Sequence, residues 1–247
     1  MRIAVAGGTG VVGRHVVDVA ARRGHDVVVL SRSAGVDLTS GDGVTERLDG
    51  VDALIDVSGV RTQSRRAARE FFGSATRHLL QAGAVAGVAH HVTLSIVGVD
   101  LVNTGYYSAK CYQEELLRQG PVPWSLLRST QFHEFAEQAL QFAVVGPVAV
   151  VPRMRVQPVA ALEVAEALLD AVQQGPRERL PDLAGPQAHD LVDLARRVAH
   201  ARHPGLRVLG IPVPGAAGRA MRSGALLPST ASHRGRVTFR QWLEQPE

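Results

Sequence analysis

The sequence predicts an α/β protein built on a doubly wound parallel sheet, and three observations lead to this prediction. Short apolar runs alternate with longer amphipathic stretches through about the first 130 residues, a pattern that is typical of βαβ units. A glycine-rich turn, Gly7–Gly13, separates the first apolar run from the first amphipathic stretch. The 247 residues are 45% hydrophobic and 20% charged, which supports a large core and excludes general disorder.

The individual strands and helices follow from the spacing of apolar residues. Arg2–Ala6 predicts a first buried strand, and Val12, Val16 and Val19 then recur on one face of a helix that Gly24 ends. The other expected strands are short apolar runs at Asp26–Leu30, Val36–Leu38, Ala53–Val57, His91–Ile96, Trp124–Leu127 and near Val148. The other expected helices are amphipathic stretches at Gln63–Ala86, Tyr106–Arg118, Phe132–Ala143, Ala160–Val172 and around Leu191–Ala201.

The turn after the first strand has the residues that the pyrophosphate of a dinucleotide requires. Its glycines match G-x-G-x-x-G, and one allows a tight turn, one a close backbone approach, and one the packing of helix on strand. The N-terminus of the following helix offers N–H groups and a partial positive charge to phosphates. We therefore expect a Rossmann-type dinucleotide site that includes the whole turn, Gly7, Gly8, Thr9, Gly10, Val11, Val12 and Gly13.

The end of the second strand predicts which nicotinamide cofactor is preferred. An acid there would bind the ribose hydroxyls of NAD, whereas an arginine accommodates the 2′-phosphate of NADP. The chain has Ser31 and Arg32 at this point, and a guanidinium can bracket a phosphate. NADP(H) is thus favoured over NAD(H), with a solvated loop arginine as the alternative. Further expected cofactor contacts are Asp37 and Leu38 beside the adenine, and the small residues Val57, Ser58 and Gly59.

A tyrosine and a lysine one helical turn apart form a candidate catalytic pair. Tyr106 and Lys110 are spaced as Y-x-x-x-K, so they share a helix face. A nearby cation favours the phenolate, which predicts a lowered pKa for Tyr106 and a role as acid or base. Lys110 is the only lysine of an arginine-rich chain, and Ser95 ends the fifth expected strand. The hydroxyl of Ser95 could reach the same pocket.

With these residues the chain resembles the short-chain dehydrogenase/reductase superfamily, and more narrowly its atypical, NmrA-like NAD(P)H-binding members. The glycine turn, the strand end at Ser95 and the Tyr106/Lys110 pair carry the resemblance, which covers about residues 1–175. It implies that Tyr106 is the proton donor or acceptor, that Lys110 holds the nicotinamide ribose and eases ionisation of the tyrosine, and that Ser95 orients the substrate oxygen.

Beyond about residue 130 the alternation becomes less regular, and the residues after Gly175 are rich in Gly, Pro and Arg. We expect a dinucleotide-binding domain at residues 1–155 and a smaller C-terminal substrate region at residues 156–247, interleaved with the first. His133 follows the sixth expected strand and is a candidate substrate contact, with a capping or packed histidine as the alternative.

Composition and charge exclude several other classes of protein. The net charge of +4 and the 4% aromatic content argue against binding to nucleic acid. The one cysteine, Cys111, excludes a disulfide framework and a cysteine-based zinc site, and the histidines lack metal-ligand spacing. The longest apolar run, Phe142–Pro152, is too short to span a membrane. The apolar start of the chain is too short for a signal peptide, so we expect a cytoplasmic protein.

These observations lead to one expected function and two alternatives. We expect an NADP-dependent oxidoreductase that moves a hydride between nicotinamide and a small carbonyl, alcohol or quinone substrate, with Tyr106 as proton relay. A non-catalytic redox sensor that binds a regulatory partner is one alternative. An epimerase or dehydratase that uses the same pocket is the other. The sequence leaves the substrate, and the association of copies into a homo-oligomer, open.

Overall fold

The computed structural model describes residues 1–62, 64–102, 104–228 and 232–245. The chain divides into two compact units, and each is assembled from three separate stretches. The first unit contains Met1–Ser95, Thr104–Arg128 and Ala161–Pro181. The second contains Ile96–Asn103, Ser129–Ala160 and Asp182–Glu247. The helix at Ala161–Gln174, which lies beyond residue 155, thus belongs to the first unit.

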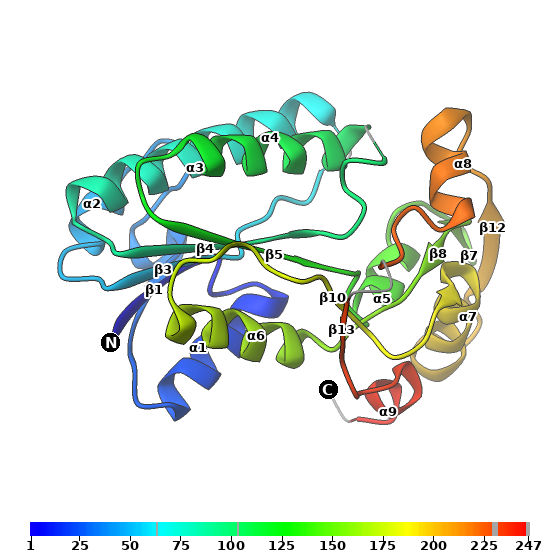
Figure 1. Ribbon diagram of the computed structural model, residues 1–247. Helices are drawn as coiled ribbons and strands as arrows, with labels where there is room; N and C mark the ends of the chain where they lie inside the picture. Colours follow the sequence, from blue (N-terminus) through cyan, green and yellow to red (C-terminus); the bar gives the residue numbers. More distant parts are fainter. Residues whose placement is uncertain (63, 103, 229–231, 246–247) are drawn as a thin grey trace. The chain divides into compact units, whose positions relative to one another are not determined.

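The first unit is a sheet with helices on both faces, which confirms the predicted doubly wound α/β fold (Figure 1). The strand order is β2-β1-β3-β4-β5, and β1 pairs in parallel with β2 and β3, as β3 does with β4. α3 and α4 cover one face, and α1 and α6 cover the other. Its strands are β1 (Arg2–Ala6), β2 (Asp26–Leu30), β3 (Ala53–Asp56), β4 (His90–Ile96), β5 (Trp124–Ser129) and β9 (Glu178–Arg179). Its helices are α1 (Val11–Arg22), α2 (Val44–Arg47), α3 (Arg65–Val85), α4 (Gly105–Gln119) and α6 (Ala161–Gln174).

The apolar residues that predicted these elements form the core of the first unit. Strands β1 and β3 are almost completely buried, as expected for parallel strands covered on both faces. Leu54 of β3 packs with Leu79 of α3 and Leu117 of α4 in one cluster. On the opposite face, Arg23 after α1 forms an ion pair with Asp170 of α6 at 2.7 Å. Apolar packing thus holds α3 and α4 on one face of the sheet, and on the other face an ion pair joins the end of α1 to α6.

The expected strand at Val36–Leu38 was wrong, because the polar groups there form turns instead of a sheet ladder. A short 3-10 helix at Arg32–Ala34 follows β2 and ends at Gly35, which has a left-handed backbone with φ +78°. The carboxylate of Asp37 then accepts a hydrogen bond from the backbone N–H of Thr39 at 2.7 Å. This segment contributes Val36 and Leu38 to the core without pairing with a strand.

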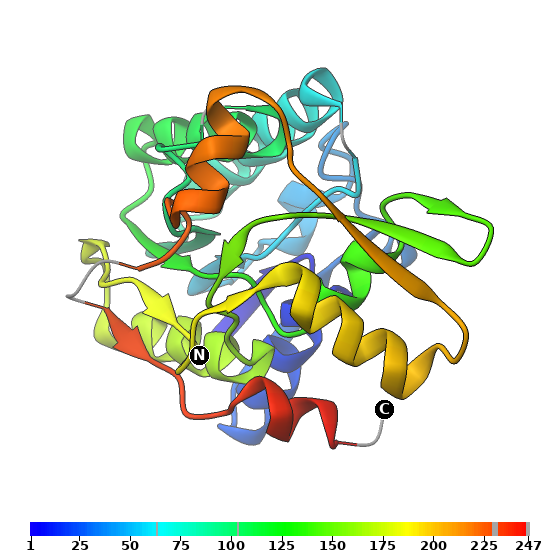
Figure 2. The same cartoon turned by 90° about the vertical axis from the view of Figure 1, so that its right-hand side faces the viewer.

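The second unit packs helices against a small sheet (Figure 2). β12 (Arg207–Ile211) pairs in parallel with β7 (Val148–Pro152), and β6 (Val144–Val145) pairs antiparallel with β7. The remaining strands of the unit are β8 (Arg155–Val156), β10 (Leu183–Ala184), β11 (His189–Asp190) and β13 (His233–Arg234). Its helices are α5 (Phe135–Leu140), α7 (Leu191–Arg202), α8 (Gly215–Ser223) and α9 (Phe239–Leu243). Among the described residues no helix is long and apolar enough to cross a membrane.

Two expected helices have different bounds in the structure. The helix expected at Phe132–Ala143 is shorter, because Phe132 forms a bridge with Val159 and the carbonyl of Ala143 accepts a hydrogen bond from Val150. The long helix expected at Gln63–Ala86 is α3, which is capped by Ser64 through a hydrogen bond from Ala67. Gln63 itself lies outside the described residues.

Candidate functional site

The glycine turn is closed so tightly that side chains are excluded from it. Gly7 has φ +82°, and a Cβ added to Gly13 would lie 2.0 Å from the carbonyl oxygen of Gly7. A Cβ on Gly7 would lie 2.7 Å from the Cα of Ser58, so the turn rests directly on the end of β3. Larger residues at these positions would push the turn away from the sheet.

The helix that follows the turn presents its first backbone N–H groups without a side-chain cap. Gly10 is the N-cap of α1 and makes no side-chain cap hydrogen bond, and the first turn contains no acidic residue. Thr9 and Gly10 are exposed, whereas Val12 packs in the core. Such a helix start can bind the negative charge of a phosphate. The structure therefore fits the pyrophosphate site that the glycine motif predicted.

The predicted cofactor residues after β2 differ in exposure and in their hydrogen bonds. Arg32 is exposed and forms no ion pair with a described residue, and the hydroxyls of Ser31 and Ser33 are 3.0 Å apart. Asp37 is held by the hydrogen bond from Thr39, which is the main reason why its pKa is lowered. The side chain of Leu38 packs in the core, and its carbonyl accepts from His78. The contact of Asp37 and Leu38 with adenine stays a prediction.

The end of β3 brings the predicted turn Val57-Ser58-Gly59 together with Tyr106. A Cβ on Gly59 would lie 3.4 Å from the phenol oxygen of Tyr106, so the phenol lies over this glycine. Since Ser58 lies under Gly7, the glycine turn, the end of β3 and the phenol follow one another along one edge of the sheet. The hydroxyl of Ser58 is buried and has no hydrogen-bond partner within the described ranges.

Tyr106 is a protonated phenol rather than the activated phenolate that the sequence predicted. Its ring packs edge-on against Phe72, with 5.3 Å between centroids. Burial, and then the negative charge of Asp56, raise the pKa of Tyr106 to about 12. The expected lowering was wrong, because the ammonium of Lys110 makes its contacts elsewhere.

Lys110 is buried, with 5% of its surface exposed, and its ammonium is in contact with three groups. It donates to the carbonyl of Leu94 at 2.7 Å and to the side-chain carbonyl of Gln113. It also lies 4.8 Å from the centre of the Phe72 ring. Burial lowers the pKa of Lys110 to about 8, although Asp56 and Glu114 oppose this change. Tyr106 and Lys110 thus both contact Phe72, and no hydrogen bond joins them within the described part of the chain.

Ser95, the third predicted catalytic residue, lies at the end of β4 and is 2% exposed. It is close enough to Glu114 to help lower the pKa of that carboxyl, but its hydroxyl forms no hydrogen bond of normal geometry with a described residue. The three predicted catalytic residues therefore come from β4 and α4, and no hydrogen bond joins them to one another in the described residues.

Sequence reasoning missed the buried polar residues around these three residues. Gln113 donates from its amide nitrogen to Asp56 at 2.8 Å, and Glu114 accepts two hydrogen bonds from Arg128. Two signals were available in the sequence. Asp56 is an acid inside an apolar strand, and Gln113 lies one helical turn after the lone lysine.

His133 belongs to the second unit, where it packs among aromatic residues. It is completely buried, its ring stacks on Trp242 with 5.7 Å between centroids, and it contacts Phe239 edge-on. Its Nε2 lies 3.1 Å from the carbonyl of Val237. This is the packed histidine that the sequence allowed as the alternative to a substrate contact.

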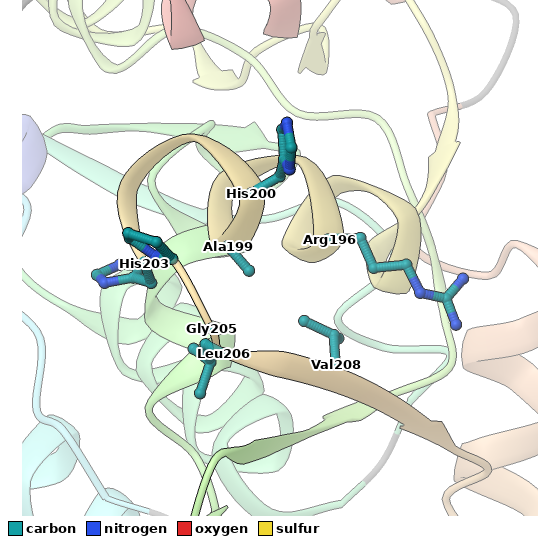
Figure 3. Close-up of a pocket in the computed structure, with 8 residues that line it drawn as sticks. Arg196, Ala199, His200, His203, Gly205, Leu206 and Val208 are labelled. Atoms are coloured by element: carbon teal, nitrogen blue, oxygen red, sulfur yellow. The ribbon is translucent and has the colours of Figure 1, made fainter.

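The second unit also contains a pocket of about 340 Å³ between α7 and β12 (Figure 3). Ala199, Leu206 and Val208 provide apolar lining. In Figure 3 the guanidinium of Arg196 and the ring of His200 point in different directions, so the polar groups do not converge on one ligand position. None of the predicted site residues lines this pocket.

Comparison with known proteins identifies what this chain is similar to. The photosystem II assembly factor Ycf39 of Synechocystis is 27% identical over 147 residues, which are 53% of this chain and 45% of that protein. The chain thus spans less than half the length of this relative. Among solved structures, the NADPH-dependent quinone oxidoreductase QOR2 of Escherichia coli, complexed with NADPH, has a TM-score of 0.69 and 18% identity over 98% of each chain.

A short-chain dehydrogenase/reductase superfamily protein of Agrobacterium tumefaciens with bound NAD has a TM-score of 0.68 and 18% identity, over 99% of this chain and 95% of that one. At these identities the two solved structures show the fold, which is the one that the sequence resemblance implied. A family model described as NAD(P)H-binding matches residues 7–174. Because this match extends over more than half of the residues, the chain belongs to the NAD(P)H-binding family.

Proposed function

We propose that this protein is an NADPH-dependent reductase of small carbonyl or quinone compounds, with Tyr106 as the proton donor. The observation that supports it most is the alignment along one sheet edge of the glycine turn, the Gly59 backbone and the Tyr106 phenol. A dinucleotide whose pyrophosphate bound at Gly7–Gly13 and whose nicotinamide end lay towards Gly59 would have an acidic hydrogen beside its reactive end.

The protonated phenol of Tyr106 is the proton donor that a carbonyl reduction needs. Bound NADPH would supply a hydride to the carbonyl carbon. The electron pair of the C=O bond then moves to the oxygen, which takes the phenolic proton from Tyr106 and becomes a hydroxyl. An alkoxide is a much stronger base than a phenolate, so a phenol with a pKa of about 12 can still donate this proton. Water afterwards reprotonates the phenolate.

Arg32 supports the preference for NADPH within this proposal. Its guanidinium is exposed at the end of β2 and forms no ion pair with a residue in the described ranges, although it lies close enough to Asp37 to help lower the pKa of that carboxyl. The quinone reductase of Escherichia coli, which shares the fold and binds NADPH, suggests quinones as the first substrates to test.

One observation favours the non-catalytic sensor as a second candidate. The contacts of Tyr106, Lys110 and Ser95 do not join them into one hydrogen-bonded group. A sensor needs only differential binding of the oxidised and reduced cofactor. Ycf39, which shares 27% identity over 147 residues, is named as an assembly factor and not as an enzyme.

The test is a screen of the purified protein with NADPH against quinones, enones and ketones, with identification of the products. A reductase would consume NADPH in proportion to a reduced product and would need no protein partner. A sensor would show no turnover, and its capture of a partner would differ between NADPH and NADP⁺. Conversion of a sugar nucleotide without net oxidation of the cofactor would instead indicate an epimerase.

A further inference from the structure

A continuous chain of hydrogen bonds links Lys110 to the backbone at the end of β3. The ammonium of Lys110 donates to the side-chain oxygen of Gln113, and the amide nitrogen of Gln113 donates to Asp56 at 2.8 Å. The other carboxylate oxygen of Asp56 accepts from the backbone N–H of Ser58 at 2.9 Å. All three side chains are buried, with exposures of 5% for Lys110 and 1% each for Gln113 and Asp56.

The donor-to-acceptor direction of these hydrogen bonds follows from the chemistry of the two charged groups at the ends, Lys110 and Asp56. An ammonium can only donate hydrogen bonds, and a carboxylate can only accept them. Gln113 can satisfy both only when its oxygen faces Lys110 and its nitrogen faces Asp56. The amide is thus fixed in one orientation, and this neutral group links the buried cation to the buried anion through two charge-assisted hydrogen bonds.

We propose that Gln113 and Asp56 are positioning residues, which hold the Lys110 ammonium in place and couple it to the cofactor turn at Ser58. The proposal rests on the reductase function, in which the cofactor contacts expected from the sequence include Ser58 and Lys110. Leu94 and Phe72 complete the surroundings of the ammonium, from β4 and α3.

The charged groups around Lys110 come from three elements. Asp56 of β3 and Glu114 of α4 both favour the ammonium form. Glu114 is itself paired with Arg128 of β5 and with Arg118 of α4. Gln113 is therefore the uncharged residue that hydrogen-bonds to both Lys110 and Asp56. Changes at Gln113 should alter the proton affinity of Lys110 in a direction that depends on the new side chain.

The lone lysine makes this measurable without a known substrate. Protein labelled with ¹³C at lysine Cε gives one Lys110 signal, whose pH titration reports its proton affinity. Gln113→Leu should lower that affinity about tenfold or more, since the ammonium loses an acceptor and its link to Asp56. Gln113→Glu should raise it by a similar factor, since a carboxylate then faces the ammonium. Gln119→Leu, at an exposed glutamine of the same helix, is the matched control and should change nothing.

NADPH supplies the second readout. In the parent protein, addition of NADPH should shift the Lys110 signal, and this shift should be reduced in Gln113→Leu at saturating cofactor. A lowered proton affinity of Lys110 in Gln113→Leu together with a raised one in Gln113→Glu supports positioning. A purely structural role of Gln113 would not change this affinity in opposite directions in the two variants. If Gln113→Leu does not fold, the proposal is tested by Gln113→Glu alone, in which the proton affinity of Lys110 should be raised.

Unchanged titration of Lys110 in the folded Gln113 variants would overturn the positioning proposal. Failure of the reductase function is a separate result. It would appear as no turnover in the substrate screen while the Lys110 signal still responds to Gln113.

Discussion

The carboxylate of Glu114 on α4 is held by the guanidinium of Arg128 on β5 through two hydrogen bonds of 2.8 and 2.7 Å. The Glu114 side chain is 2% exposed, and Arg118 donates a further hydrogen bond to it at 2.8 Å. Burial alone would raise the pKa of Glu114, but the hydrogen bonds and charges of the arginines lower it overall. This pair fixes the helix that carries Tyr106 and Lys110 to the sheet.

Removal of Glu114 should therefore be strongly destabilising. Glu114→Ala leaves the partly buried Arg128 without its carboxylate, and breaking a buried pair typically costs about 3–5 kcal/mol. Urea denaturation should show this loss in the free energy of unfolding. Glu244→Ala breaks the exposed Arg240–Glu244 pair and should cost less than about 1 kcal/mol. Because the pKa of Glu114 is lowered on folding, its contribution should disappear as the pH falls below its usual value of 4.5. Equal losses in the two variants would contradict this role.

The Tyr106→Phe variant tests the proton donor. The phenol oxygen has no hydrogen bond that supports the fold in the described ranges, so the variant should fold and bind NADPH nearly as the parent does. Turnover on any substrate that the parent reduces should fall about 10²- to 10⁴-fold, since proton donation is lost. Tyr107→Phe, which changes the neighbouring, partly buried phenol, should retain activity within a few-fold. Full activity in Tyr106→Phe would exclude the proposed mechanism.

The Arg32→Ala variant tests the choice of cofactor. A charge-assisted contact with the 2′-phosphate contributes roughly 1.5–3 kcal/mol, which is about one to two decades in affinity. Calorimetry should show tighter binding of NADPH than of NADH to the parent, and Arg32→Ala should remove most of this difference. NADH binding should be nearly unchanged in the same variant. Equal affinities of the parent protein for both cofactors would contradict the preference.

The burial of Lys110 predicts an alkaline increase in stability. Its pKa is lowered from 10.5 to about 8 on folding, so between these values the unfolded chain binds more protons than the folded protein. The free energy of unfolding should therefore rise between about pH 8 and 10.5, by up to about 3 kcal/mol from this residue. Lys110→Met should lack this rise. The difference between the two proteins isolates Lys110, since the buried tyrosines, whose pKa values are raised, affect both equally. A pH-independent difference would show that Lys110 keeps an ordinary pKa.

Two glycine variants with opposite expected effects test the turn. Gly13→Ala places a Cβ 2.0 Å from the Gly7 carbonyl oxygen, so the turn must open and dinucleotide binding should be lost. Gly83→Ala adds a methyl group within α3, where the nearest atom is 3.6 Å away. There we expect a gain of about 0.5–1 kcal/mol, because alanine favours the helix over glycine. Thermal unfolding and NADPH titration of both variants make the comparison, and unchanged binding in Gly13→Ala would exclude the turn as the phosphate site.

The sequence by itself determined the regular part of the fold. Parallel strands buried on both faces are continuous apolar runs, and helices that pack on one face repeat their apolar residues every three or four positions. Both patterns are local, so β1, α1, β2, β3 and α6 could be predicted to within a few residues. The NAD(P)H-binding family was also evident locally, because the glycine turn follows from the backbone geometry of a few consecutive residues.

Tertiary structure decided the polar contacts of the site. The spacing of Tyr106 and Lys110 correctly placed them on one helix, but it predicted an activating cation beside the phenol. The acceptors that hold the Lys110 ammonium instead come from β4 and from Gln113. Asp56 of β3 in turn accepts a hydrogen bond from Gln113. Burial then raises the pKa of Tyr106 and lowers that of Lys110, and the extent of burial depends on packing between distant segments. Helix periodicity fixes which residues share a face, whereas the electrostatic state of a buried group depends on every element that removes water from it.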